Sequence, residues 1–243
     1  MRMLAFSNRN LKEIVRDPLT VAFSLGFPLV LLLLLSAIQA NIPVPMFEIE
    51  TLAPGMCIFG LTFMTLFSAT LIARDRETSF LRRLYTTPMR AGDFICGYML
   101  PIIPISVGQS AVCYAAAFAL GLKPDLGVLW SLLSIVPVSL FFIALGLLCG
   151  SLLTVKQVGG ICGALLTNLA AWLSGIWFDL ELVGGAFRDI AYALPFVHAV
   201  ELERGLVSGS GTEVLLHVGV LAGYTVLAIA LAVAAFLRKM HRE

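Results

Sequence analysis

Long apolar runs alternate with short polar segments along most of this chain. Each run approaches the roughly 20 residues that an α-helix needs to cross a bilayer. The pattern predicts an all-α membrane protein with six transmembrane helices. We expect the spans at about residues 19–39, 52–73, 94–120, 128–153, 158–178 and 213–237.

These spans and their short loops use nearly every position after residue 18, so we expect residues 19–243 to form a single six-span domain. Hydrophobic residues make up 59% of the chain and charged residues 13%. That charged fraction is about half the value for a typical soluble domain. The net charge of +1, without a long basic tract, gives no indication of nucleic-acid binding.

The cysteines lie in apolar surroundings and show no spacing typical of metal ligands. We interpret them as small buried hydrophobic residues rather than as disulfides or metal ligands. They are Cys57, Cys96, Cys113, Cys149 and Cys162.

Residues 1–18 have the pattern of an amphipathic helix that lies along the membrane surface. Leu4, Leu11, Ile14 and Val15 face one way, and the charged positions face another. Asp17-Pro18 then restarts the chain, with aspartate as a cap and proline in the first turn of the next helix.

A strongly charged segment, residues 74–90, separates the second and third apolar runs and contains five of the sixteen Lys and Arg residues. Residues 75–87 are expected to form a short amphipathic helix, which Pro88 ends. Between two spans such a helix lies at the membrane surface, where it can contact a cytoplasmic protein. The alternative is a solvated loop that only sets orientation.

Residues 179–212 are long and moderately apolar, and they are interrupted by Gly184-Gly185 and Pro195. Two pieces, about residues 182–194 and 196–207, are each too short to span a bilayer. The pattern favours a re-entrant helical hairpin at about residues 180–208, dipping in from the outer side. An ordinary outer loop is the alternative.

The distribution of Lys and Arg decides the expected orientation. With both termini inside, the inner segments hold thirteen of these residues and the outer segments hold Lys123, Arg188 and Arg204. We therefore expect both termini, and the helix at residues 75–87, to be cytoplasmic.

Two kinds of site are absent from the sequence. There is no Gly-x-x-x-x-Gly-Lys-Ser/Thr phosphate-binding loop. No ionisable residue lies deep in any predicted span, whereas proton- or ion-coupled transporters place such groups there. Energy for any transport must then come from another protein.

Four stretches resemble the membrane subunit of ABC exporters of the ABC-2 type. Residues 10–35 begin Asn-Leu-Lys-Glu-Ile-Val-Arg-Asp-Pro and continue into a leucine run, which is similar to the usual opening of that family. Residues 73–89 resemble its charged Thr-Thr-Pro element. Residues 173–178, Leu-Ser-Gly-Ile-Trp-Phe, resemble the end of its fifth span, and residues 190–204 the segment that follows.

The resemblance implies roles for two segments. Residues 1–18 would be the connecting helix, and residues 75–87 would be the coupling helix that docks on a separate ATPase subunit. Asp75 stands where the family usually has Glu, and Ser79 where Gly is commoner, both mild departures. The expected contact residues are Arg74, Asp75, Glu77, Thr78, Arg82, Arg83 and Tyr85.

In related exporters the second and fifth spans of two protomers face each other across a central cavity. The residues expected to line it here are Phe59, Thr62, Phe63, Phe67, Asn168 and Trp172. Lipid-facing or core positions are the alternative for the aromatic residues. Asn168 is the strongest candidate, because an amide in mid-span needs a polar partner and should face protein or a cavity.

Two other function classes fit the sequence less well. An intramembrane serine protease would have to use Ser110 and His217, but the third span is the wrong place for its serine and the motif is short. A secondary transporter is disfavoured by the missing intramembrane charges. His198 and His217 are interpreted as interfacial hydrogen-bonding residues rather than metal ligands.

The sequence thus predicts a permease subunit of an ATP-driven exporter in a prokaryotic plasma membrane. The partners would be two ATP-binding subunits and a second permease protomer, either identical or a close paralogue. The chain itself would hold no cofactor or metal and no catalytic residue, since ATP and Mg²⁺ would bind to the partner. The cargo would be amphiphilic: a drug, a peptide antibiotic or a lipid-linked molecule.

Overall fold

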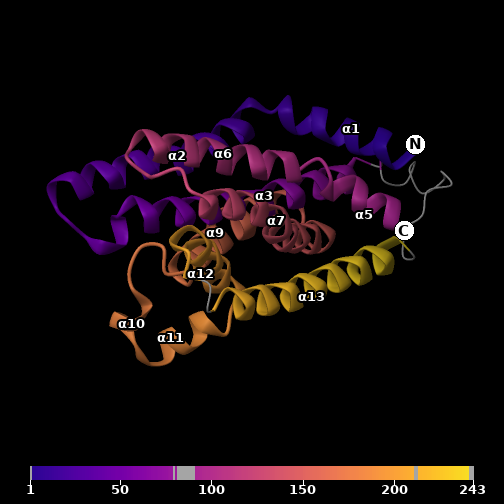
Figure 1. The fold of residues 1–243 in the computed structure, drawn as a ribbon. Coiled ribbons are helices and arrows are strands. Elements are labelled where there is room, and N and C mark those ends of the chain that lie inside the picture. Colours follow the sequence, from indigo (N-terminus) through magenta and orange to yellow (C-terminus); the bar gives the residue numbers. More distant parts are fainter. Residues whose placement is uncertain (1, 79, 81–90, 211–212, 241–243) are drawn as a thin grey trace.

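A computed structural model describes residues 2–78, 80, 91–210 and 213–240, and this part of the chain is helical with no strand (Figure 1). The elements are α1 (Arg2–Val15), α2 (Pro18–Asn41), η1 (Pro45–Phe47), α3 (Ile49–Glu77), α5 (Ala91–Met99), α6 (Ile103–Ala119), α7 (Leu126–Leu152), α8 (Val155–Val158), η2 (Gly159–Leu166), α9 (Thr167–Trp172), α10 (Leu180–Val183), α11 (Gly185–Tyr192), α12 (Pro195–Ser208) and α13 (Val214–Met240).

Five helices among the described residues are long and apolar enough to cross a membrane. They confirm the all-helical membrane class, and they lie at Val21–Asn41, Ile49–Glu77, Gly92–Ala119, Leu126–Leu152 and Val214–Arg238.

The span expected at residues 158–178 is not among these five helices. Its place is taken by α8, η2 and α9 in succession, and η2 is a π-helix. Gly159, Gly160 and Gly163 weaken the regular helix here, because glycine is a poor helix former, and a π-helical turn interrupts the ladder of hydrogen bonds. The sixth span therefore stays a prediction.

The third predicted span is interrupted where the sequence places its prolines. Helix α5 ends at Met99 and α6 begins at Ile103, with Pro104 in the first turn of α6. A proline lacks the N–H that would continue the helical ladder, so the break at residues 100–102, which include Pro101, follows from local chemistry.

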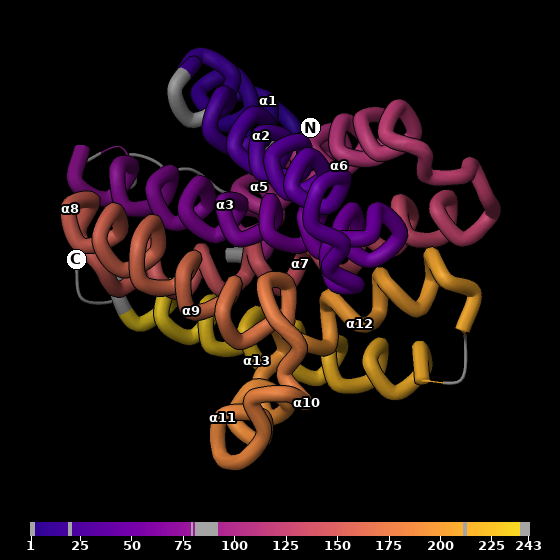
Figure 2. Tube along the Cα trace, turned by 90° about the vertical axis from the view of Figure 1, so that its left-hand side faces the viewer, coloured from indigo at the N-terminus to yellow at the C-terminus, as the bar shows by residue number. Residues whose placement is uncertain are grey.

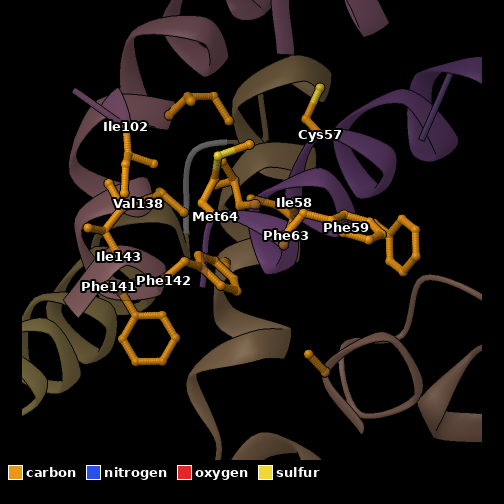
Figure 3. Packing of buried hydrophobic residues seen from close by; sticks show 14 of the residues in the cluster. Cys57, Ile58, Phe59, Phe63, Met64, Ile102, Val138, Phe141, Phe142 and Ile143 are labelled. Atoms are coloured by element: carbon orange, nitrogen blue, oxygen red, sulfur yellow. The ribbon is translucent and has the colours of Figure 1, made fainter. Parts of the chain in front are cut away.

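Helix α3 is the central element, and most of its side chains are buried. Helix α7 packs closely against it because Gly146 and Gly150 present no side chain to the α3 backbone. Thr65 and Ser68 of α3 donate hydrogen bonds to carbonyl oxygens of α7, at 2.9 Å to Phe142 and 3.0 Å to Ile143. Most buried hydrophobic residues of α3 and α7 belong to one core cluster. In Figure 3, Val138 and Ile143 lie on one side of this cluster and Phe59 on the opposite side.

The start of α1 and the end of α13 lie at the same end of the bundle, whereas α10 and α11 lie toward the other end (Figure 1). Helix α2 and the α8–η2–α9 segment both pack on α3 (Figure 2). Within the predicted hairpin at residues 180–208, α12 packs against α3, α7 and α13. Helices α10 and α11 project away from the bundle (Figure 2).

The close approach of α7 to α3 gives a direct test of the packing. An alanine Cβ at Gly146 would clash with Ser68 Oγ and the Thr65 carbonyl oxygen. Gly146→Ala should therefore destabilise the purified protein by about 1–3 kcal/mol, the usual cost of overpacking. Gly219→Ala, where nothing lies within 4 Å of the added atom, is the control, and thermal unfolding in detergent is the measurement. Equal melting temperatures for the two variants would contradict the packing described here.

Candidate functional site

A buried carboxylate, Asp75, organises the last turn of α3. Its side chain is about 2% exposed, and Arg9 of α1 approaches it with both Nη atoms, at 2.8 and 2.9 Å. Tyr98 of α5 donates a third hydrogen bond at 2.8 Å. Paired, bidentate geometry is what a buried carboxylate requires. Asp75 thereby joins three helices at one point.

We call this meeting point of α1, α3 and α5 the Asp75 joint. Further contacts strengthen it around Arg9. The guanidinium also pairs with Glu13 at 2.7 Å and lies 4.3 Å from the centre of the Phe80 ring. Burial lowers the pKa of Arg9, but the neighbouring Asp75 and Glu13 carboxylates outweigh this effect and raise it above the ordinary value. Asn10 donates to the Gly97 carbonyl oxygen of α5 at 3.0 Å. Helix α1 is therefore held to the end of α3 by charge as well as by packing.

The same turn of α3 is tied to the junction between α7 and α8. Arg76 donates to the carbonyl oxygens of Gly150 at 2.6 Å and Leu153 at 3.2 Å, where the last turn of α7 leaves carbonyls without helical partners. The Glu77 carboxylate accepts from the backbone N–H of Val155 at 2.9 Å, at the start of α8. The end of α3 thus contacts both flanks of the bundle directly before residues 79–90.

The predicted ATPase-contact residues divide into three groups. Arg74, Glu77 and Thr78 are exposed. Arg74 forms a loose ion pair with Asp17 at 3.8 Å, and Thr78 donates to the Arg74 carbonyl oxygen. Asp75 is buried and is used inside the chain. Arg82, Arg83 and Tyr85 lie outside the described residues.

Four of the predicted cavity residues line one groove of about 530 Å³. Phe59, Phe63 and Phe67 of α3 form its floor, and Asn168 of α9 lies on one wall. The opposite wall is α2, through Phe23 and Phe27. We call this hollow between α2, α3 and the η2–α9 segment the aromatic groove.

Its rings pack against one another. The Phe27 ring lies 5.9 Å from the rings of Phe59 and Phe63, which are 5.6 Å apart, with edge-on or tilted contacts typical of aromatic pairs. Sequence reasoning missed Phe23 and Phe27. Their spacing of four residues places them on one side of a helix. However, the surrounding run is apolar throughout, so its pattern does not show which side faces the protein.

The other two predicted cavity residues lie elsewhere. Thr62 is buried and donates to the Phe59 carbonyl oxygen at 2.6 Å. Trp172 is 55% exposed and packs near Phe178, with ring centres 5.9 Å apart. Asn168 donates to its own helix, to the Ala164 carbonyl oxygen at 2.7 Å. The polar partner that the Asn168 amide needs is therefore supplied by its own helical segment, and the Asn168 side chain still lines the groove.

A second buried polar cluster was not expected. Glu203 of α12 is fully buried, and its carboxylate accepts hydrogen bonds from Ser131 and Ser134 of α7. Tyr114 of α6 contacts Ser131 in turn. The sequence placed Glu203 in an outer segment, and no pattern near it distinguishes it from Glu201, which is only half-buried.

The two histidines are brought together by the fold. The Nδ1 atoms of His198 and His217 lie 2.8 Å apart, and His198 Nε2 lies 3.0 Å from the Tyr192 carbonyl oxygen. The described residues contain no group of three ligand-type side chains that could hold a metal ion. Ser110 of α6 is hydrogen-bonded to Gln109 instead of to His217.

The cysteines are free. Cys57, Cys113 and Cys162 are buried and Cys149 is half-buried, as expected for small hydrophobic residues. Cys96 departs from that expectation because it is exposed.

Residues 1–207 match the family model described as "ABC-2 type transporter". Among curated proteins, Nodulation protein J from Bradyrhizobium diazoefficiens is 27% identical over 231 residues, which is 93% of this chain and 85% of that protein. Nodulation protein J from Rhizobium leguminosarum bv. viciae is 27% identical over 197 residues, 79% of this chain and 75% of the relative.

A third relative, Nodulation protein J from Rhizobium meliloti, is 25% identical over 181 residues, 74% of this chain and 68% of that protein. The match to the family model covers the charged segment, the aromatic groove and most of the predicted hairpin. The chain therefore belongs to the ABC-2 type transporter family and is a membrane permease of that family.

Proposed function

We propose that this permease exports an amphiphilic molecule and is driven by a separate ATP-binding subunit. The observation that carries the proposal is the aromatic groove, which is open along one side of α3. Its volume of about 530 Å³ lies within the range of small-molecule sites, and its lining combines aromatic surface with one amide. Such a surface accepts varied apolar cargo without fixed hydrogen-bond geometry.

The Asp75 joint supplies a route from the ATPase to the groove. Residues 75–87 are the proposed docking element, and helix α3 extends into them, because it continues to Glu77. Because α3 also carries Phe59, Phe63 and Phe67 along the same rigid helix, a displacement of its end would move the floor of the groove. Asp75 would then act as a positioning residue that keeps α1 and α3 together during that movement.

A second protomer fits the exposure pattern around the groove. Phe23 and Phe27 on α2, and Leu165, Leu169 and Trp172 beyond the other wall, are all exposed. Two copies facing one another would enclose these side chains and convert two open grooves into one cavity. Two ATP-binding subunits would then match the two permease copies.

A secondary transporter is the second candidate, and Glu203 is the observation that favours it. Among the described residues its hydrogen-bond partners are the hydroxyl groups of Ser131 and Ser134, and a buried carboxylate of this kind can bind a proton. Transport that stops when the proton gradient is dissipated, and persists without an ATP-binding subunit, would support this candidate over the first.

Breaking the joint should uncouple transport from ATP hydrolysis. Asp75→Asn removes the charge that pairs with Arg9 and leaves the side chain nearly the same size. Cargo moved per ATP hydrolysed should fall about fivefold or more, the scale of a typical coupling free energy. The assay is transport and phosphate release by the permease reconstituted with its ATP-binding subunit in vesicles.

Asp189→Asn, on the exposed helix α11, is the matched control and should keep the wild-type ratio. If Asp75→Asn also keeps that ratio, the joint has no part in coupling.

The groove is tested through cargo-dependent ATP hydrolysis. Phe63→Ala and Asn168→Ala should each weaken the stimulation of ATPase activity by cargo, with a loss of about tenfold in apparent affinity for Phe63→Ala, since truncating a well-packed aromatic contact costs more than about 1 kcal/mol. Phe118→Ala, an exposed position on α6, is the control. Unchanged stimulation in both groove variants would contradict the proposal that cargo binds in the aromatic groove.

The proposed orientation places both termini in the cytoplasm of a prokaryotic cell. On a background without the native cysteines, Leu182→Cys and Ser208→Cys should react with an impermeant thiol reagent in intact cells. Lys156→Cys should react only after permeabilisation. All three positions are exposed, so the opposite labelling pattern would reverse the topology.

A further inference from the structure

Three neighbouring hollows share lining residues near the α1–α2 junction and along α3. The first, about 670 Å³, lies where α1 meets α2 and is lined by Arg9, Lys12, Arg16 and Arg74, together with Glu13 and Asp17. We call it the basic groove. Figure 2 shows α1 and α2 side by side above α3.

A smaller hollow of about 200 Å³ lies between the basic groove and the aromatic groove. It shares Glu13, Asp17 and Arg74 with the first, and Leu66 and Phe67 with the aromatic groove. From Arg74 to Phe63 the distance along α3 is about 16 Å, at 1.5 Å per residue. One extended molecule can therefore contact both ends.

The charges of the basic groove are only partly compensated. Arg9 is paired with Asp75 and Glu13, and Arg74 with Asp17. The two carboxylates of the groove thus already have cationic partners, and the four cations with Glu13, Asp17 and Asp75 leave a net charge of +1. Lys12 and Arg16 are exposed and have no acidic partner within the part of the chain that the structure describes.

The opposite end has the reverse character. Apart from Asn168 and Thr167, the described residues that line the aromatic groove are apolar, and none of them is charged. A cation-rich hollow joined to an uncharged aromatic one is complementary to a molecule with an anionic head and an apolar tail.

We propose that the cargo is an anionic amphiphile, with its acidic head group at Lys12 and Arg16 and its apolar chain running past Phe67 to Phe63. This inference rests on the proposed export function, because it names the class of molecule that the aromatic groove accepts. A zwitterionic or cationic amphiphile would leave the two cations uncompensated or would be repelled by them.

The test uses the purified full-length permease without any ATP-binding subunit. Binding of dodecyl phosphate, of dodecylphosphocholine with the same tail, and of inorganic phosphate is measured by native mass spectrometry in a neutral detergent. Dodecyl phosphate should bind about tenfold more tightly than dodecylphosphocholine, and inorganic phosphate should not compete with it at equal concentration.

Variants separate the two ends of the site. Lys12→Gln combined with Arg16→Gln should reduce dodecyl phosphate binding to the level of dodecylphosphocholine, whereas Phe63→Ala should weaken both ligands equally. Lys123→Gln combined with Arg188→Gln removes two exposed charges that line none of the three hollows and should change neither. Lys12→Arg preserves the charge and should retain binding.

Three results would overturn the proposal. They are equal affinity for the two dodecyl ligands, an equal loss in the control pair of substitutions, and competition by inorganic phosphate as strong as that by dodecyl phosphate. The last would indicate a site for a free anion. The two proposals fail in different measurements. If the cargo is not an anionic amphiphile, the selective binding is absent but the reconstituted complex still transports with ATP. If the export function is wrong, the reconstituted complex does not transport, whereas binding to the isolated chain is unaffected.

Discussion

The rest of the structure depends on one constraint, which is that the carboxylate of Asp75 lies inside the protein and must be paired there. Arg9 and Tyr98 satisfy it, and they come from α1 and α5. An unpaired charge at this position would cost several kcal/mol. The need for partners therefore fixes how α1 and α5 sit against α3, and it places a junction of three helices at the start of the charged segment at residues 74–90.

Helix α3 has two faces with different roles. One face meets α7 closely, because Gly146 and Gly150 admit backbone contact and hydrogen bonds from Thr65 and Ser68. Small residues and polar groups drive such helix association in lipid, where burial of apolar surface supplies little. The other face keeps its phenylalanines at an open groove between α2 and α9. Structural cohesion and cargo contact can thus use the same helix without competing for the same side chains.

Charge is distributed along this second face in a way that suits its proposed role. The cations of the basic groove lie where α1 meets α2, and the aromatic groove lies one helical segment away, with Phe67 lining the passage between them. The joint at Asp75 lies beside the passage. A movement that begins at the end of α3 would therefore reach both the basic groove, where the head group is proposed to bind, and the aromatic groove, where the tail is proposed to bind.

The sequence alone determined the helical membrane class, the proline break between α5 and α6, and the family, because these depend on local hydrophobicity, backbone chemistry and motif order. The resemblance to related exporters grouped six residues around a cavity between two protomers, and four of them, Phe59, Phe63, Phe67 and Asn168, line one groove within this chain; their contact with cargo stays a prediction. Only the tertiary structure decided that Phe23 and Phe27 complete that groove, that Asp75 is an internal partner of Arg9, and that Glu203 is buried against α7. Each of these depends on contacts between residues far apart in the chain, which exclude water or lipid from one another. A local sequence pattern does not determine which distant residues make such contacts.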